Sequence, residues 1–462
     1  MKGREKKGMG FRLGRRAVLA GAASLAPTLA FGQQTQPRRA DPSGPPIVFV
    51  HGNGDSAALW INNLWRFESN GFKRSLLFAI DLAYPNARTD DSKPQENRSS
   101  TEDAMKDLAA YVAQVKKTTR QAKVALIASS RGGNTVRNYL KNGGGAASVS
   151  HAILCGTPNK GIVISDTMLV GSEFNGAAPF LKGLNAGADD LIAGVQMMAI
   201  RSDKNDKFSQ PDARFVGFPG KPSGVGYDAS ELRGAKNVII DGLDHRETAF
   251  HKLAFAAQFE FITGRAPGTL FIANEPLPVL NGRVTGIASD GAYTNLPVTG
   301  ADVEIYDVDP RTGERKSNSP MHKKTTGADG MWGPFIGHSD ASYEFVLTMQ
   351  GQPITHTYRS PFLRGCDFID LRPQPFGKGD DQAGAVVIMS RARGYLGVGR
   401  DKFSLDGKVP PGINDGVPGA ASGKLSFDAI PRTVMAVFNT ETIAARTWPV
   451  KDNHMVVAEF MN

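Results

Sequence analysis

The sequence predicts an α/β protein with a mostly parallel sheet and helices on both faces, followed by one or two C-terminal β-sandwich-like domains. Two short, wholly apolar runs, 47–50 and 124–127, are typical of strands that are buried on both faces. Segments with helical spacing alternate with such runs up to about residue 263. Beyond that point, short strand-like segments separated by Gly- and Pro-containing turns predict β-structure only.

The predicted α/β elements follow one another in a regular order. After the first strand, 47–50, Ser100-Thr-Glu-Asp103 opens a helix that continues with apolar residues at helical spacing to Val115. The strand 124–127 is followed by a helix over about 132–141 and by a strand at 151–155. Strands at 197–200 and 238–240 and a helix over about 248–263 complete the unit.

Changes in composition divide the chain. Gly264-Arg-Ala-Pro-Gly268 separates the α/β domain from the β-structure, and a Pro- and Gly-rich stretch begins at Arg372. We therefore predict a targeting peptide over 1–32, an α/β domain over 33–268, a β-sandwich domain over 269–372 and a second β-rich domain over 373–462. A single β domain over 269–462 remains the alternative.

The first 32 residues have the layout of an export signal. Residues 1–16 contain seven basic residues and one acidic residue, +6 of the formal net charge of +9, so the rest of the chain carries only +3. Arg15-Arg16 precedes the apolar stretch 17–29 and a small-residue cleavage site at 30–32, which resembles a twin-arginine signal. We expect an exported protein, periplasmic or extracellular.

Other features bear on partners and cofactors. No later apolar run reaches 18 residues, so no membrane-spanning helix is expected. No basic stripe with interleaved aromatic residues occurs, so nucleic-acid binding is not expected. Cys155 and Cys366 lack neighbours at zinc-ligand spacing, and a disulfide between them stays possible. We expect no metal or other cofactor, and the sequence carries no signal for an oligomeric state.

Ser130 is the candidate nucleophile. It follows a buried strand and is flanked at minus two and plus two by small residues, Ala128 and Gly132, whereas Ser129 is not flanked in this way. A turn from strand to helix that is tight enough to expose a serine has room only for such small residues. The positive N-terminal end of the following helix points at the serine hydroxyl. A plain Ser/Gly loop after a strand is the alternative.

The loop His51-Gly-Asn-Gly54 directly after the first strand is the candidate oxyanion loop. The backbone N–H groups of Asn53 and of Arg131, the residue after the nucleophile, are the two expected oxyanion donors. A glycine turn without a catalytic role is the alternative.

His245 is the candidate general base, because it lies on a loop between a strand and a helix at the same edge of the sheet. The competitor, His251, falls inside the predicted helix. Asp206 is the candidate acid, since it lies just beyond a predicted strand and gives the chain order Ser, Asp, His. Asp203 in the same loop is the second choice. Two weaker candidates for the acid are Asp212 and Asp228.

With these residues assembled, the chain resembles bacterial and archaeal lipases of the α/β-hydrolase superfamily. Ala128-Ser-Ser-Arg-Gly132 is similar to the Ala-x-Ser-x-Gly form of small bacterial lipases, and the segment 234–245 is similar to the stretch that leads to their catalytic histidine. Over about 45–400 the chain is similar to long archaeal carboxylic-ester lipases with an appended β-domain. The resemblance implies ester hydrolysis and a C-terminal region that helps to hold the acyl chain.

The chain departs from the archaeal pattern in the place of the acid. Where that pattern has a carboxylate soon after the strand that follows the elbow, this chain reads Cys155-Gly-Thr-Pro-Asn159, which directs the role to the Asp206 loop. The Arg131 side chain is unusual there, and we expect either a contact with an anionic substrate group or, in preference, a surface salt bridge. The apolar insertion 161–194 is interpreted either as a lid over an acyl pocket or as a packed helix with its loop.

The sequence thus predicts a serine ester hydrolase of the lipase or esterase type that acts on a lipid or another ester, with possible contact between the C-terminal β-domains and a lipid interface or polymer surface. One alternative is a polyester depolymerase whose β-domains adsorb to insoluble polyhydroxyalkanoate. Another alternative is a binding protein that keeps the fold without activity.

Overall fold

The structure, a computed structural model, describes residues 44–428 and 430–461. The predicted signal peptide, 1–32, lies outside the described residues. Among the helices of the described part, none combines the length and the apolar character needed to cross a bilayer. The two cysteines, Cys155 and Cys366, are both buried and both free, so the possible disulfide does not form.

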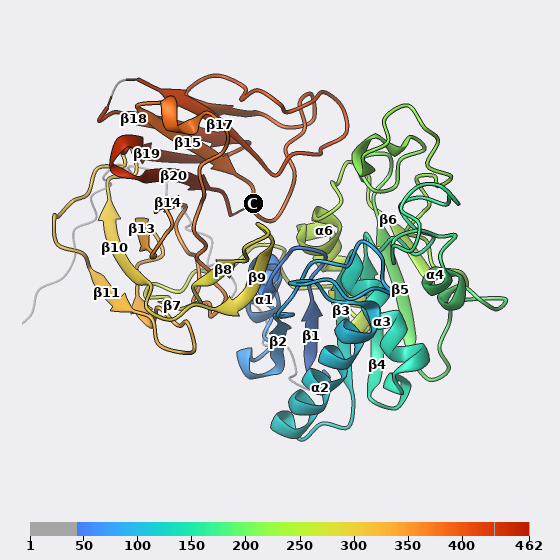
Figure 1. The fold of residues 1–462 in the computed structure, drawn as a ribbon. Coiled ribbons are helices and arrows are strands. Elements are labelled where there is room, and N and C mark those ends of the chain that lie inside the picture. The colour runs from blue at the N-terminus through green and yellow to red at the C-terminus, as the bar shows by residue number, and fades with distance from the viewer. Residues whose placement is uncertain (1–43, 429, 462) are drawn as a thin grey trace, which may run out of the picture. The chain divides into compact units, whose positions relative to one another are not determined.

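The α/β part contains a six-stranded sheet in the order β2-β1-β3-β4-β5-β6 (Figure 1). All of its neighbouring pairs are parallel, which confirms the predicted parallel sheet. The strands are β1 (Ile47–Val50), β2 (Leu77–Ile80), β3 (Val124–Ser129), β4 (Val149–Cys155), β5 (Gln196–Arg201) and β6 (Lys236–Ile239). Because the strands are parallel, the loops that follow β1, β3, β4, β5 and β6 leave the sheet at the same edge.

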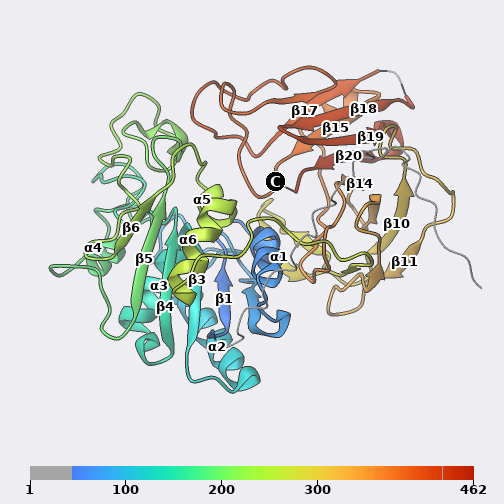
Figure 2. The ribbon, with the colours of Figure 1, turned by 180° about the vertical axis from the view of Figure 1, so that it is seen from behind.

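Helices cover both faces of this sheet, as predicted (Figures 1 and 2). Phe49 on β1 and Ile127 on β3 pack with Phe67, Phe255 and Phe259 from two helices on one face. The alternate strand residues pack on the other face with α2 and α3. The helices are α1 (Ile61–Ser69), α2 (Thr101–Thr119), α3 (Arg131–Asn142), α4 (Pro179–Leu184), α5 (Glu247–Phe250) and α6 (Lys252–Thr263).

The ends of two helices show how the sequence sets them. Helix α2 begins after Ser100, whose side chain accepts a hydrogen bond from the Asp103 N–H while the Asp103 carboxylate accepts from Ser100 N–H. The helix predicted over about 248–263 is in fact two, because His251 has extended ψ (148°) and separates α5 from α6. The His251 ring then accepts a hydrogen bond from Leu253 N–H at the start of α6. Short 3₁₀ segments occur at Ala57–Trp60, Arg74–Leu76, Gly145–Ala147, Ala213–Val216, Asp380–Gln382 and Val450–Asp452.

The C-terminal part is β-rich. A seven-stranded sheet has the order β11-β10-β13-β14-β20-β15-β17, and a three-stranded antiparallel sheet has the order β16-β18-β19. Side chains of both sheets, such as Val387, Val456, Val434 and Phe438, share one buried cluster, which is the core of a sandwich. The strands of the seven-stranded sheet are β10 (Asp302–Val308), β11 (His322–Thr325), β13 (Ser342–Thr348), β14 (Ile354–Arg359), β15 (Ala385–Ser390), β17 (Ser422–Phe427) and β20 (His454–Glu459). The others are β16 (Phe403–Leu405), β18 (Thr433–Phe438), β19 (Glu441–Arg446) and two small antiparallel pairs, β7 (Val279–Leu280) with β12 (Phe335–Ile336) and β8 (Thr285–Ile287) with β9 (Tyr293–Pro297).

One sheet joins the two predicted β-rich segments. Strand β14, from 269–372, pairs in parallel with β20, and β20 pairs in parallel with β15, both from 373–462. The last strand of the chain, β20, therefore lies between two strands that are consecutive in the sequence, one on each side of the predicted boundary. Such a long-range parallel pairing leaves no mark in local sequence, and the boundary proposed at 372/373 stays a prediction.

Candidate active site

Ser130 lies at the junction of β3 and α3 and has a backbone conformation that side chains rarely adopt, with φ 53° and ψ −124°. A non-glycine residue at positive φ is strained, and such strain persists only where the surroundings impose it. Ser130 N–H donates to Cys155 O at 2.9 Å, which fixes the turn against the end of β4. The serine is half-buried, at the edge where the strands end. The predicted elbow is therefore present.

Two glycines allow this turn to form. A Cβ on Gly132 would stand 2.5 Å from His51 O and 2.7 Å from Val50 O. A Cβ on Gly52 would stand 2.9 Å from the Ser130 Cβ. The elbow and the His51–Gly54 loop are therefore in direct backbone contact, which only glycine permits at these two positions.

The loop with the candidate oxyanion donor Asn53 is held from beneath by His51. The ring of His51 is 1% exposed, its Nδ1 lies 2.8 Å from Gly52 O, and its Nε2 lies 3.1 Å from Leu82 N. These contacts fit a neutral ring that donates from Nδ1 and accepts at Nε2. Burial lowers the pKa of His51 to about 4, so the ring stays neutral. The Asn53 side-chain oxygen accepts a hydrogen bond from Ala87 N–H at 2.7 Å, and the backbone N–H of Asn53 stays the candidate oxyanion donor.

Asp206 and His245 form a buried pair. Both carboxylate oxygens of Asp206 lie 2.9 Å from His245 Nδ1, and both side chains are about 3% exposed. Asp206 Oδ1 also accepts a hydrogen bond from Phe208 N–H at 2.8 Å, which orients the carboxylate. Within the described residues, His245 Nε2 is buried and has no hydrogen-bond partner. The imidazole is thus fixed at one nitrogen and available at the other.

The position of His245 relative to Ser130 follows from the end of β4. Ser130 N–H bonds to Cys155 O, and the next residue, Gly156, has φ 56°. A Cβ on Gly156 would stand 2.8 Å from His245 O and 3.4 Å from His245 Nδ1. The serine and the histidine therefore both lie against the two-residue segment 155–156. The structure brings the three sequence-predicted residues to one edge of the sheet.

The competing candidates have other roles. Asp203 Oδ1 accepts from Ser202 Oγ at 3.0 Å and from Asn205 N–H at 3.1 Å. Asp212 caps a 3₁₀ turn by accepting from Arg214 N–H, and Asp228 pairs with Lys160 Nζ at 2.5 Å. His251 begins α6 instead of facing Asp206. Their contacts favour Asp206 and His245 over each of them.

The Arg131 side chain differs from the expectation of a surface salt bridge. It is 1% exposed, and it forms a two-point ion pair with Glu173, with Nε–Oε1 at 2.8 Å and Nη2–Oε2 at 2.7 Å. Its Nη1 also donates to Ser99 Oγ at 2.9 Å and to Pro85 O at 3.2 Å. The partner, Glu173, lies 42 residues further along the chain, so nothing in the sequence near Arg131 indicated this buried pair. A substrate-facing role of this guanidinium is equally wrong, since its donors are used inside the protein.

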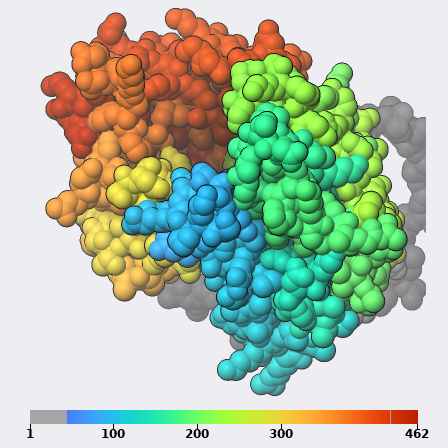
Figure 3. Space-filling model, turned by 45° about the vertical axis from the view of Figure 1, so that its right-hand side comes forward, coloured from blue at the N-terminus to red at the C-terminus, as the bar shows by residue number. Residues whose placement is uncertain are grey.

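Glu173 belongs to the insertion 161–194, which forms part of the molecular surface (green in Figure 3). Near the other end of the insertion, Asp190 accepts from Arg137 Nη2 at 3.2 Å and from Arg233 Nη2 at 2.8 Å. Val163 and Met168 are buried with Ala213. These attachments favour a packed segment over a lid that opens freely.

The sequence did not indicate several residues around the Asp206–His245 pair. The Phe208 ring meets the imidazole edge-on, with ring centroids 4.7 Å apart. Thr248 Oγ1 donates to His245 O at 2.7 Å. Lys207 Nζ lies 3.9 Å from the centroid of the Tyr395 ring, and burial lowers the lysine pKa to about 8. Proximity to Asp206 in sequence was the only available signal for Phe208 and Lys207, and nothing local pointed to Tyr395.

Comparison with protein families identifies the two parts of the chain. Residues 44–212 match the profile of class 2 lipases, and residues 279–376 match that of the lipase C-terminal domain. The chain is a carboxylic ester hydrolase with a lipase-type catalytic domain. The profile over 44–212 includes Ser130 and Asp206 of this hydrolase, whereas His245 lies beyond it.

Solved structures with which the hydrolase aligns include the mature form of Bacillus licheniformis lipase BlEst2, with 21% identity, 48% of this chain and 94% of that chain covered, and a TM-score of 0.38. The propeptide form of the same lipase aligns with 18% identity over 67% of this chain and 73% of that chain, with a TM-score of 0.37. Aspergillus fumigatus lipase B aligns with 17% identity over 49% of this chain and 54% of that chain, with a TM-score of 0.35. No curated protein matches the hydrolase.

Proposed function

We propose that the hydrolase cleaves carboxylic esters of lipid type through Ser130, His245 and Asp206 and a covalent acyl-enzyme. The observation that carries the proposal is the His245 ring, which is held at Nδ1 by Asp206 and has an unpartnered Nε2 among the described residues, while His245 and the strained Ser130 both lie against residues 155–156. Nucleophile, base and orienting acid in this arrangement form the triad pattern of acyl transfer.

In the proposed mechanism, His245 Nε2 takes the proton of the Ser130 hydroxyl as Oγ attacks the ester carbonyl carbon. The backbone N–H groups of Asn53 and Arg131 donate to the oxyanion of the tetrahedral intermediate. The imidazolium then gives its proton to the leaving alcohol, and the acyl group stays on Ser130. A water molecule, deprotonated by His245, attacks the acyl carbonyl and releases the carboxylic acid. Asp206 stabilises the imidazolium throughout.

Turnover of a medium-chain p-nitrophenyl ester by the wild type, Ser130→Ala and Asp206→Asn tests this assignment. We expect Ser130→Ala to lower kcat by at least about 10³-fold and Asp206→Asn by at least about 10²-fold, because a unit of three residues fails when one is lost. Asp203→Asn is the matched control and should stay within about threefold of the wild type. A Ser130→Ala variant with wild-type turnover would contradict the proposal.

We also propose that the hydrolase is exported and that its β-rich region contacts a lipid interface. Export is supported by the Arg15-Arg16 pair and the apolar stretch that follows it. The contact with lipid is supported by the match of 279–376 to a lipase C-terminal domain. Replacement of both arginines by lysine should retain the protein in the cytoplasm, and fractionation measures this. Unchanged export of that variant would overturn the twin-arginine route.

A further inference from the structure

Two carboxylates form hydrogen bonds with the backbone of the loop that carries His245. Asp244 Oδ1 accepts the N–H groups of Arg246 at 2.8 Å and of Glu247 at 2.9 Å. Glu247 Oε2 accepts the N–H of Asp244 at 2.7 Å. The two acidic residues thus tie together the backbone on both sides of His245. Asp244 is 0% exposed and Glu247 is 9% exposed, so this turn with two carboxylates is buried.

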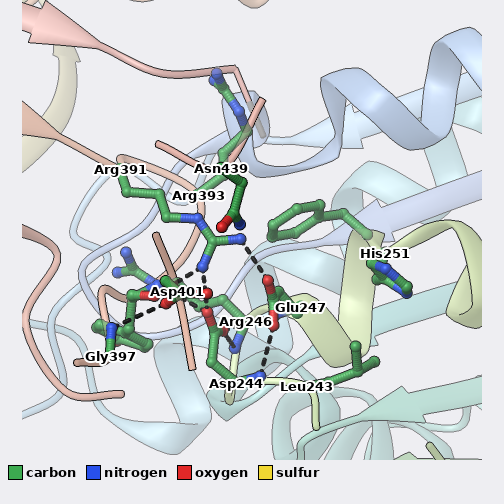
Figure 4. Close-up of polar contacts among 12 residues, drawn as sticks. Leu243, Asp244, Arg246, Glu247, His251, Arg391, Arg393, Gly397, Asp401 and Asn439 are labelled. Carbon is green, nitrogen blue, oxygen red and sulfur yellow. Dashed lines mark hydrogen bonds and ion pairs between the residues drawn. The ribbon is translucent and has the colours of Figure 1, made fainter. Parts of the chain in front are cut away.

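Arg391, from the C-terminal region, bridges these two carboxylates (Figure 4). Its Nη1 lies 2.6 Å from Asp244 Oδ2, and its Nη2 lies 2.5 Å from Glu247 Oε1. One guanidinium therefore holds both ends of the four-residue turn 244–247. The Arg391 side chain is 3% exposed, so water does not screen these contacts.

Arg400 adds a second cation to the same turn. Its Nη1 lies 2.6 Å from Glu247 Oε2 and 3.3 Å from Gly242 O, while its Nη2 lies 3.6 Å from Asp244 Oδ2. Tyr395 N–H also donates to Asp244 Oδ2 at 2.8 Å. The segment 391–400 thus contacts both buried carboxylates, through Arg391, Tyr395 and Arg400.

Arg246, directly after His245, ties the loop to the oxyanion side of the site. Its Nη2 lies 2.7 Å from Asp55 Oδ1, and its Nη1 donates to Ala392 O at 3.1 Å. Asp55 follows the candidate oxyanion residue Asn53 by two positions. The same segment of the C-terminal region therefore contacts both residues that flank His245.

We propose that Arg391 and Arg400 are positioning residues for His245, so that the C-terminal region completes the catalytic site and does not serve only to hold substrate. This inference rests on the function proposed above. Two buried carboxylates at the two ends of one turn repel each other unless cations lie between them, and the planar arginine fork fixes their separation as well as offsetting their charge. The position of the imidazole depends on that separation, since His245 lies between the two acids.

Arg391→Lys and Arg400→Met test the proposal in the full-length chain with a soluble p-nitrophenyl ester. Lysine at 391 keeps the positive charge that offsets the buried carboxylates, so this variant should still fold. It cannot bridge two carboxylates as a rigid fork, so it should lose the positioning effect. We expect each substitution to lower kcat by about 10- to 100-fold through misplacement of the base, with KM changed by less than about threefold. Near-ultraviolet circular dichroism reports whether each variant folds.

Arg364→Met is the matched control. Arg364 also joins the C-terminal region to the α/β domain, through Glu68 at 2.9 Å, but it contacts no residue of the His245 turn. We expect this variant to keep wild-type kcat. Wild-type kcat in both Arg391→Lys and Arg400→Met, or an effect confined to KM, would overturn the positioning role. An inactive Ser130→Ala would in that case still support the proposed function. Wild-type turnover in Ser130→Ala would overturn the proposed function itself.

Discussion

Ser130 and His245 belong to one proposed catalytic unit, but different parts of the chain hold them. Ser130 is placed by its own strand, its own helix and two glycines that adjoin the same turn. His245 is placed by Asp206 on another loop and by a turn whose carboxylates are paired with Arg391, 147 positions away in sequence from Asp244. The nucleophile is thus placed by contacts within the α/β domain, whereas the base depends on the folded C-terminal region.

This difference has a physical origin. A strained backbone turn requires missing Cβ atoms, and Gly132 in the turn and Gly52 on the loop that packs against it meet the requirement. A histidine on a loop has few local constraints, so its orientation needs contacts from elsewhere, and buried ion pairs supply direction as well as strength. Substitutions near Ser130 should therefore act by sterics, and substitutions near His245 should act by charge and packing.

Gly132→Ala tests whether the placement of Ser130 depends on sterics. The new Cβ would meet two backbone oxygens, the nearer at 2.5 Å, so the elbow or the His51 loop must move. We expect kcat/KM for a p-nitrophenyl ester to fall by about 100-fold or more. Gly183→Ala is the matched control, because a Cβ there meets nothing within 4 Å. Equal activity of the two variants would show that the elbow tolerates a side chain.

Glu173→Gln tests whether the elbow also depends on a distant charge. The substitution leaves the buried Arg131 guanidinium without its carboxylate, which should lower the free energy of unfolding by about 3–5 kcal/mol in urea titrations. Glu102→Gln, which breaks the exposed pair with Lys106, is the control and should leave stability unchanged. A stable Glu173→Gln variant would mean that the insertion 161–194 is attached by other contacts.

The buried His51 beneath the oxyanion loop should give a pH dependence. Its folded-state pKa of about 4 lies below the ordinary value of 6.5, so the unfolded chain takes up the proton first as pH falls. The contribution of the neutral His51 ring to the free energy of unfolding is fully present above pH 6.5. It is lost as pH falls towards 4, by up to about 3 kcal/mol. Urea unfolding of the wild type and His51→Gln from pH 7.5 to 4 measures the difference. The exposed His338→Gln should follow the wild type, and a parallel profile for His51→Gln would contradict the expectation.

Phe208→Leu should have the smallest effect. The ring supports the His245 imidazole edge-on at 4.7 Å, a contact worth about 1 kcal/mol, so kcat should fall by about three- to tenfold. Phe271→Leu, at a side chain that is 82% exposed, should leave kcat unaltered. A lower kcat in both variants, or in neither, would show that Phe208 does not support the His245 ring.

The sequence could predict those features of the molecule that depend on residues close together in the chain. Apolar runs and helical spacing gave the parallel sheet with helices on both faces, and Ala128, Ser130 and Gly132 gave the elbow. The pairing of Asp206 with His245 was also predicted, from chain order. The Arg131–Glu173 pair and the Arg391 bridge were out of reach, because an arginine in a sequence does not reveal which carboxylate it will meet when buried. The placement of β20 between β14 and β15 was hidden for the same reason.

Labelling with a fluorophosphonate, followed by mass spectrometry of the peptides, tests the central claim most directly, because the reagent modifies a serine only where a base and oxyanion donors activate it. We predict one adduct on the peptide that contains Ser130, none in Ser130→Ala, and a rate reduced by at least about 10²-fold in His245→Ala. An adduct on another serine, or an unaltered rate in His245→Ala, would contradict the account.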